Sequence, residues 1–323
     1  MDNYKLLVNG FDITGRVGGL SSTEDIDALS VQLSFTVVKN PHDKYIPAFT
    51  LAPGDKIQLF NNQSLVFRGI VIKTGLDGSV QANDFGYYLN KSKIILQCNG
   101  VPADEGIRQL GAKAGVSVGS LPSMPTKITE IFVDKTPAEI LKSILETVTA
   151  ERGTKYFYRV EPDSGLCIYP YPSTPIKLRV QLARNLRTFD PTWSLGDVSG
   201  EDSMDGLCNQ VTIYRTEDEN ARVLAKATDS ASISKYGWIQ HMESADEGVT
   251  AAQARQMAQT KLAELNQLTV TRKVDNMLGA DVRAGEMLQF SSDKFGLSGN
   301  WMIKQITHNY DSTHTMSMEV IQP

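Results

Sequence analysis

The sequence predicts a mainly β protein with an α+β insert, in which two β-rich domains flank a small α+β domain. Short runs of alternating apolar and polar residues, separated by Gly, Pro and Asn, fill residues 1–95 and return over residues 181–323. Residues 96–180 instead combine helical periodicity with short strands. The two terminal segments also contain stretches that resemble each other. One helix, at about residues 250–266, interrupts the second β-rich domain.

The two terminal segments carry similar blocks in the same order. Each has an acidic block that runs into an alternating stretch, then a block with glycine and an acidic residue, and then a hairpin. The matched pairs are Ser22–Leu29 with Ser199–Leu207, Val31–Val37 with Val211–Ile213, Pro53–Phe60 with Ala284–Phe290, and residues 65–82 with 301–320. We infer one duplicated β domain, whose second copy carries a large insertion. A ring of chains that each carry two similar domains has twice as many similar domains as chains. The duplication therefore suits an adaptor between two symmetries.

The middle segment predicts two helices and a hairpin. Pro102–Gly115 has proline at its first turn and glycine at its end, as short amphipathic helices do. Thr136 and Glu139 form a capping box that opens a longer apolar stripe ending before Gly153. The alternation in 156–169 then predicts two strands. These elements suffice for a compact α+β module.

Composition excludes several classes of protein. The chain has 323 residues, 41% of them hydrophobic, which is enough for two or three ordinary domains. No apolar run reaches the roughly 18 residues of a membrane span, so we expect a soluble protein made in the cytoplasm. A net charge of −5 with dispersed Lys and Arg argues against specific nucleic-acid binding. Cys98, Cys167 and Cys208 are expected to be free thiols.

Motifs that carry catalytic or metal chemistry are weak. Gly115-Val-Ser117-Val-Gly119 matches the nucleophile-elbow pattern, but its serine follows a predicted helix where the elbow needs a strand. The four histidines, His42, His241, His308 and His314, lack the spacing of a metal-binding helix face. His308 and His314 are expected to form a polar pair across the last hairpin, at a surface turn. We therefore predict no catalytic residue, no cofactor and no metal ligand.

The two acidic blocks are the candidate interaction residues. A catalytic carboxylate pair would normally occur once, in one cleft, whereas these carboxylates recur in both copies. We predict that they lie near the contacts between domains and contribute to an oligomer interface. The predicted interface residues are Glu24, Asp25, Asp27, Glu201, Asp202 and Asp205.

The order of blocks over nearly the whole chain resembles one known family. The blocks that carry the resemblance are Ala103–Gly119, Lys135–Leu145, Lys155–Val160, Met204–Ile213 and Ala284–Phe290. They are similar to baseplate hub proteins of contractile phage tails and phage-tail-like particles, notably the type found in PBSX-like defective prophages. The resemblance implies two tail-tube-like β-barrel domains per chain, at 1–95 and 181–323, and a homotrimer. It also implies a structural, non-enzymatic role with no catalytic residues to carry over.

In that family's role, three chains offer six barrel positions. Such a hub joins a sixfold tail tube protein to a threefold central spike protein, among other baseplate proteins, in the phage tail or tail-like particle. The sequence leaves two other classes open. One is a tail-associated cell-wall hydrolase, and the other is a cell-wall or glycan-binding module built on residues 96–180. Whether the particle delivers DNA or acts as a bacteriocin is not encoded in these patterns.

Overall fold

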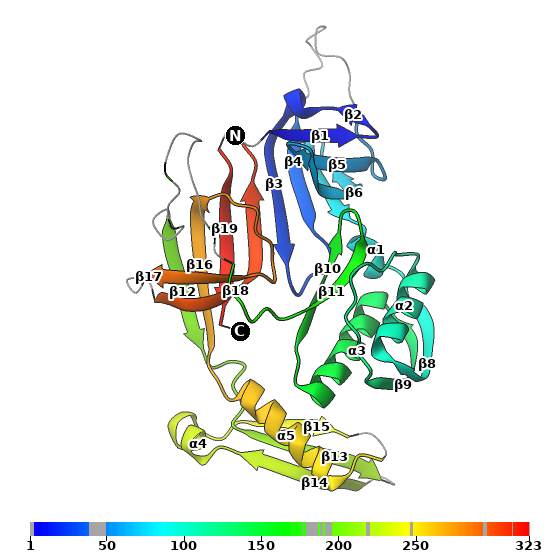
Figure 1. Cartoon of the computed structure of the whole chain (residues 1–323), viewed down its shortest axis with the longest axis vertical. Coiled ribbons are helices and arrows are strands. Elements are labelled where there is room, and N and C mark those ends of the chain that lie inside the picture. Colours follow the sequence, from blue (N-terminus) through cyan, green and yellow to red (C-terminus); the bar gives the residue numbers. More distant parts are fainter. Residues whose placement is uncertain are drawn as a thin grey trace. The chain divides into compact units, whose positions relative to one another are not determined.

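The structure is a computed structural model that describes residues 3–322 apart from 39–49, 177, 179–186, 188–189, 191–195, 218–219, 246–247, 293–295 and 312. The chain divides into two compact units (Figure 1). The larger comprises Met1–Leu145, Lys155–Ser199 and Arg272–Pro323, and the smaller comprises Glu146–Thr154 and Gly200–Thr271. Strands dominate the described residues, which confirms the predicted mainly β class with helical segments.

One large sheet carries both terminal segments. The N-terminal strand repeat consists of β3 (Val17–Asp25), β4 (Gln32–Val37), β5 (Lys56–Asn61), β6 (Ser64–Thr74) and β7 (Ser79–Asp84). The C-terminal strand repeat consists of β12 (Asp197–Ser203), β16 (Thr269–Leu278), β17 (Met287–Ser292), β18 (Leu297–Asn309) and β19 (Thr315–Ile321). The first repeat is preceded by β1 (Tyr4–Val8), β2 (Phe11–Asp12) and the short 3-10 helix η1 (Thr14–Arg16).

The two repeats share one topology. Their strands pair in the order β3-β4-β7-β6-β5 in the first repeat and β12-β16-β19-β18-β17 in the second. The sheet therefore shows that the duplication inferred from sequence is a duplication of structure. It also shows that β4 corresponds to β16, which follows the inserted segment.

One predicted correspondence is wrong. The alternating stretch at Val211–Ile213 was matched with Val31–Val37, but it lies in β13 (Gln210–Glu217), outside the large sheet. Both stretches alternate because each is a strand with one buried face, and alternation alone cannot say which sheet a strand joins.

The turn before β5 and the turn before β17 match at the level of single hydrogen bonds. Gly54 donates its N–H to the Val71 carbonyl at 2.8 Å, and Gly285 donates to the Ile303 carbonyl at 2.8 Å. Both glycines have positive φ, at 96° and 86°, a conformation that favours glycine. This explains why the Gly-acidic block recurs in both copies.

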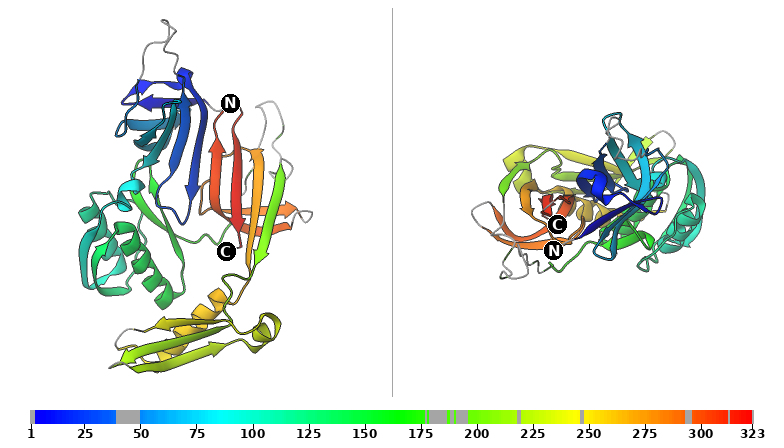
Figure 2. Two further views of the ribbon diagram at one scale, coloured as in Figure 1. Left: turned by 180° about the vertical axis from the view of Figure 1, so that it is seen from behind. Right: turned by 90° about the horizontal axis from the view of Figure 1, so that it is seen from above.

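The repeats do not form closed barrels. Within the described residues, the path of the sheet runs openly from β12 at one end to β2 at the other. The predicted tube-like barrels are thus present as open, curved sheets in the single chain. The side-by-side strands of the two repeats are visible in Figure 2.

The two repeats have well-packed apolar residues. Leu33, Ile57, Leu59 and Ala82 of the first repeat are fully buried, as is Trp301 of the second at 1% exposed. Other buried side chains of the second repeat are Met302, Ile303, Ile306, Met316 and Val320. Period-2 burial along these strands puts one face of the sheet in the core.

The middle segment forms the predicted helices and hairpin. Its elements are α1 (Gly86–Leu89), β8 (Ile94–Pro102), α2 (Ala103–Ala114), β9 (Lys127–Lys135), α3 (Pro137–Arg152), β10 (Tyr156–Glu161) and β11 (Gly165–Pro170). The capping box of α3 is present, since Thr136 N–H donates to Glu139 and Glu139 N–H donates to the Thr136 hydroxyl oxygen. Gly115 ends α2 with φ 67°.

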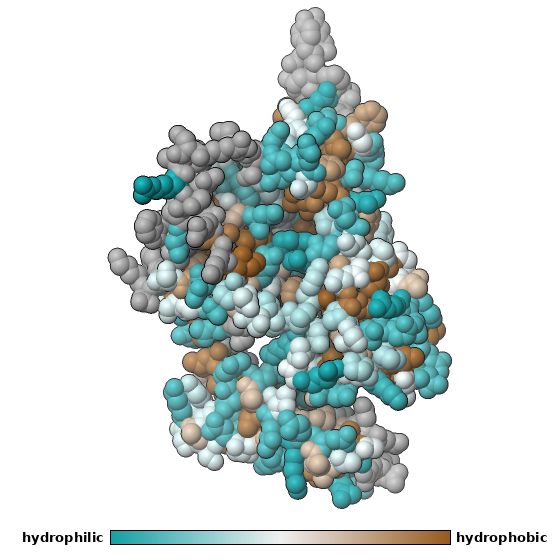
Figure 3. Space-filling view, in the orientation of Figure 1, coloured by the Kyte–Doolittle hydropathy of each residue, from teal (hydrophilic) through white to brown (hydrophobic). Residues whose placement is uncertain are grey.

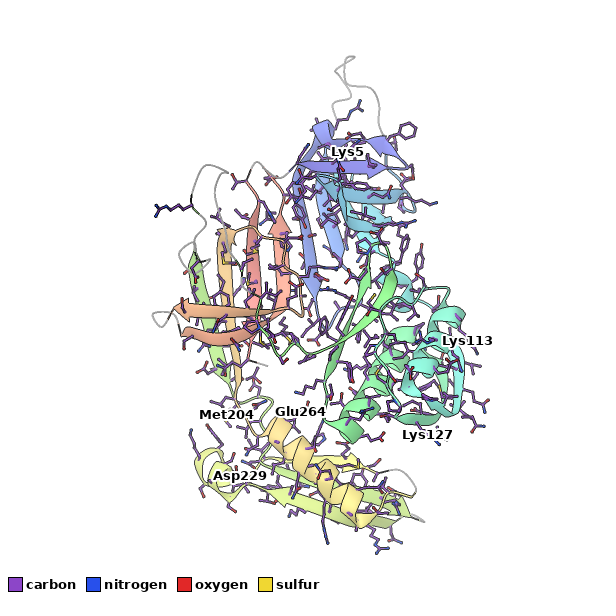
Figure 4. The ribbon with its side chains drawn as sticks, viewed as in Figure 1. Lys5, Lys113, Lys127, Met204, Asp229 and Glu264 are labelled. Carbon is purple, nitrogen blue, oxygen red and sulfur yellow. The ribbon has the colours of Figure 1, made fainter. Side chains whose placement is uncertain are left out.

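Most of the smaller unit comes from the insertion in the second copy. It contains β13, β14 (Asn220–Thr228), α4 (Ser230–Tyr236), β15 (Gln240–Ser244) and α5 (Ala251–Leu265), with sheet order β14-β13-β15. The predicted helix at 250–266 is α5, and its Thr250–Gln253 capping box is present. Asp229, labelled in Figure 4, caps α4 by accepting from Ala231 and Ser232 N–H groups. Fully buried Val211, Ile213, Ala254 and Ala258 form its small core.

Candidate functional site: the junction between the strand repeats

The two repeats are joined within the chain by direct strand pairing. β3 of the first repeat runs antiparallel to the second half of β18, with Asp25 opposite Gln305 and Glu24 opposite Ile306. Ile26 N–H donates to the Lys304 carbonyl at 3.0 Å and continues the ladder past the strand end. The edge of the first repeat is thus satisfied by the second repeat.

A partly buried ion-pair network centres on Arg283. Its guanidinium donates to Glu24 through Nη2 to Oε1 at 2.6 Å and through Nε to Oε2 at 3.1 Å, and its Nη1 donates to Glu161. The side chain of Glu24 is 11% exposed and that of Arg283 is 24% exposed. Because the bidentate geometry and burial strengthen charge-assisted hydrogen bonds, this network clamps three segments distant in sequence.

Glu161 connects the clamp to the middle segment. It accepts from Arg159 Nε at 2.6 Å and from the Tyr169 hydroxyl at 3.1 Å, so the β10-β11 hairpin is tied to the junction. Burial alone would raise the pKa of Glu161, but Arg283 and Arg159 outweigh it and hold that pKa below its usual value. The carboxylate is therefore ionised at neutral pH.

The structure separates the roles of the first acidic block. Glu24 is buried in the network, whereas Asp25 accepts from Asp27 N–H at 2.8 Å and shapes the turn after β3. Asp27 is exposed and lines a cavity of about 480 Å³ with residues that include Lys91, Lys142 and Tyr158. Glu24 thus lies at the contact between the two repeats of one chain, and a role in contacts between chains remains a prediction.

The second acidic block lies at the matching end of the second repeat. Glu201 and Asp202 are exposed residues of β12, and Asp205 follows in the turn after this strand. Asp205 donates its N–H to the Ser203 hydroxyl at 3.1 Å, as Asp27 does to Asp25. Their predicted place in an oligomer interface remains a prediction.

His308 and His314 form the predicted pair, but His308 is buried and His314 is half-buried, so the pair does not lie at a surface turn. His308 is only 9% exposed, its Nε2 lies 2.9 Å from the Val282 carbonyl, and its Nδ1 lies 2.9 Å from Nε2 of His314. Because a carbonyl only accepts, His308 donates from Nε2, and its neutral ring then accepts from His314. The burial was misjudged because the end of β18 also pairs with β3, where His308 lies opposite Ser22. His42 lies outside the described residues.

This buried ring predicts a stability loss in acid. Burial and the nearby His314 lower the pKa of His308 to about 4. The unfolded chain binds a proton at this ring below its ordinary value of about 6.5, whereas the folded chain does not until about pH 4, so stability falls as pH drops through that window. The full loss from this group is about 3 kcal/mol. Urea unfolding of the parent chain and of a His308→Gln variant from pH 7.5 to 4 isolates this loss as the difference between the two proteins.

The His308→Gln variant is the control for that prediction. It should be less stable than the parent chain at pH 7.5 and lose less stability on acidification. Asp84 has the opposite effect in both proteins, because burial raises its pKa to about 7 and its protonation favours the folded state as pH falls. Equal pH slopes in the two proteins would contradict the assignment to His308.

The Gly115–Gly119 segment does not form a nucleophile elbow. Ser117 lies in the loop after α2, and its carbonyl accepts from Leu166 N–H at 2.8 Å, so the elbow arrangement is absent there. No group of three or more His, Cys, Asp or Glu among the described residues could hold a metal ion. Likewise, none of the described helices is long and apolar enough to span a membrane.

The middle segment also exposes aliphatic side chains that the sequence did not single out. Ile95, Ile131 and Val133 lie on the outer face of β8 and β9 and are 60%, 60% and 57% exposed. In the view of Figure 3, hydrophobic residues come to the surface in separate patches among hydrophilic ones. Arg283 was missed as well, because a single arginine before a Gly-acidic block has no distinctive sequence pattern.

The comparisons with known proteins agree with this architecture. A family model described as YQBQ-like matches residues 21–321. The chain belongs to the YQBQ-like family. This YQBQ-like chain is 23% identical over 282 residues to "Phage-like element PBSX protein XkdQ" of Bacillus subtilis (strain 168), covering 85% of this chain and 83% of that protein. The predicted resemblance to a PBSX-type prophage protein is confirmed.

Solved structures share the fold of the YQBQ-like chain. The 43 kDa tail protein of prophage MuSo2 from Shewanella oneidensis matches with a TM-score of 0.71 at 14% identity, over 100% of this chain and 98% of that one. The E. coli c3393 protein, a type VI secretion component described as similar to T4 tail proteins gp27 and gp5, matches with a TM-score of 0.50 at 11% identity, over 99% and 77%. The protein is thus phage tail and baseplate-like in sequence and fold.

Proposed function

We propose that this protein is the structural hub of a contractile tail baseplate, a homotrimeric adaptor between a sixfold tail tube and a threefold central spike. The observation that carries the proposal is the shared topology of the two strand repeats, joined edge to edge by β3 and β18. Three chains supply six such repeats. A ring of six near-equivalent sheets presents one face to a sixfold partner while the chains keep threefold symmetry.

The proposed partners follow from this geometry and from the relatives. A tail tube protein would contact the pseudo-sixfold ring, and a trimeric spike protein would contact features that occur once per chain. Other baseplate proteins would surround them. The similarity to c3393, with its stated likeness to gp27 and gp5, supports a place beside the spike.

The proposed organisation assigns a task to each segment. Residues 1–95 and 181–323 hold the two repeats that build the ring, and residues 96–180 form the α+β domain between them. The Arg283 network fixes the two repeats of one chain and the β10-β11 hairpin to each other. The role is structural, and we propose no catalysis. The place of action is the baseplate of a phage tail or tail-like particle.

The proposal is tested by counting chains. Full-length protein is produced within its complete tail gene cluster, the assembled hub is isolated, and its mass is measured by native mass spectrometry. We expect three copies of this chain per hub. One copy, or six copies, would contradict a trimeric adaptor.

A further inference from the structure

The second repeat ends in a strand edge that the first repeat does not have. In the sheet, β3 lies between β4 and β18, whereas β12 has β16 as its neighbour and ends the described path. β3 and β12 occupy the same place in their repeats. An edge strand offers backbone N–H and C=O groups to another chain.

The first repeat has a matching acceptor position. The second half of β18 takes up β3, and β6 is the counterpart of β18. Val71 N–H donates to the Asp55 carbonyl and Ile303 N–H donates to the Glu286 carbonyl, both at 2.8 Å, so Val71 corresponds to Ile303. After these residues, the pairing of β6 with β7 and the pairing of β18 with β19 each skip one residue. Lys73 is therefore the counterpart of Gln305.

The register on β12 also follows from the structure. The strands end at Asp25 and Ser203, and both residues accept the N–H of the residue two further on. Ser203 is therefore the counterpart of Asp25, and Asp202 is the counterpart of Glu24. Placing the sequence pair Glu24-Asp25 on Glu201-Asp202 would instead align Asp25 with Asp202, one residue away from this structural match. The difference matters because a one-residue slip turns every side chain to the other face.

We propose that β12 of one chain pairs with the end of β6 of a second copy, with Ser203 opposite Lys73 and Asp202 opposite Thr74, as β3 pairs with β18 within a chain. This inference rests on the proposed trimer and gives the register of its contacts. Lys73 is exposed, and in the described part of the chain the end of β6 pairs with β7 on one side only. Leu76, fully exposed in the following turn, would be covered by the incoming strand.

The two kinds of junction differ in chemistry. Ala52 N–H donates to the Asp55 carboxylate at 2.8 Å and Arg283 N–H donates to the Glu286 carboxylate at 3.0 Å, so Ala52 is the counterpart of Arg283. Alanine has no guanidinium. The junction between chains therefore lacks the clamp found within a chain and depends on strand pairing and the cover of Leu76.

Disulfide cross-linking tests the register. Asp25 and Gln305 form a non-hydrogen-bonded pair, because Ile26 N–H donates to the Lys304 carbonyl. Cα atoms in such a pair are about 4.5 Å apart, within the range of a disulfide. The Lys73→Cys, Ser203→Cys double variant is made in a Cys208→Ser background, since Cys98 and Cys167 are buried. Hubs assembled within the tail gene cluster are oxidised and run on a non-reducing denaturing gel.

We expect most of the chain to run as covalent dimers and trimers, with nothing larger than three chains. Lys73→Cys with Asp202→Cys is the one-residue control and should cross-link at least fivefold less. Asp25→Cys with Gln305→Cys should cross-link within one chain and shows that the oxidation works. Two results in a three-chain hub would overturn the register but leave the trimer. One is stronger cross-linking in the one-residue control, and the other is no cross-linking in the Lys73→Cys, Ser203→Cys variant. A hub without three copies would overturn both.

Discussion

Replacing Arg283 with methionine is expected to lower the free energy of unfolding of the larger unit by about 3–5 kcal/mol. The change removes the donor of the hydrogen bonds to Glu24 and Glu161 and leaves the buried Glu24 carboxylate without its cation, while Glu161 keeps Arg159. An uncompensated buried charge costs far more than a lost surface ion pair. Urea unfolding followed by circular dichroism at pH 7.5 measures the loss.

Two further variants separate the network from general damage. Adding Glu24→Gln to Arg283→Met should restore much of the lost stability, because Glu24 is the carboxylate left without a cation, whereas Glu161 keeps Arg159. Lys93→Met breaks the exposed ion pair with Asp134, whose side chains are 58% and 73% exposed, and should have no measurable effect. An Arg283→Met variant as stable as the parent chain would show that the clamp does not hold the repeats together.

Replacing Trp301 with alanine should cost about 3–5 kcal/mol and reduce assembly of the hub. The indole is 1% exposed in the core of the second repeat, opposite Leu288 on β17, and its Nε1–H donates to the Ser298 carbonyl at 3.2 Å. The change removes buried apolar surface and leaves a cavity that the sheet cannot fill. Thermal unfolding and the yield of assembled hub report the two effects.

Trp238 provides a matched control. It is the same residue type but is 63% exposed, in the smaller unit. Trp238→Ala should change stability by no more than about 0.5 kcal/mol. If the two alanine variants were equally stable, Trp301 would not be the core residue that the structure indicates.

The sequence predicted the architecture where local patterns are strong. The mainly β class, the capped helix α3, the helix α5 and the β10-β11 hairpin each have a clear period or cap. The Gly-acidic blocks were also matched correctly, because a positive φ before a strand needs glycine in both copies.

Features that depend on distant pairing were not predictable. The Val211–Ile213 stretch was placed in the wrong sheet, and the smaller unit as a whole was seen only as a helix in an insertion. Arg283 and its partners lie far apart in sequence, at Glu24 and Glu161, so no local pattern marks them. His308 was expected at a surface turn, and only the pairing of β18 with β3 explains its burial.

A three-dimensional image of the assembled baseplate by cryo-electron microscopy tests the central claim most directly. We predict a single ring at the end of the tail tube in which three chains supply six strand repeats, with β3-β18 pairing inside chains alternating with β12-β6 pairing between them. The claim would be contradicted by a ring of six chains that each supply one repeat, or by a ring that contains only one of the two repeats of each chain.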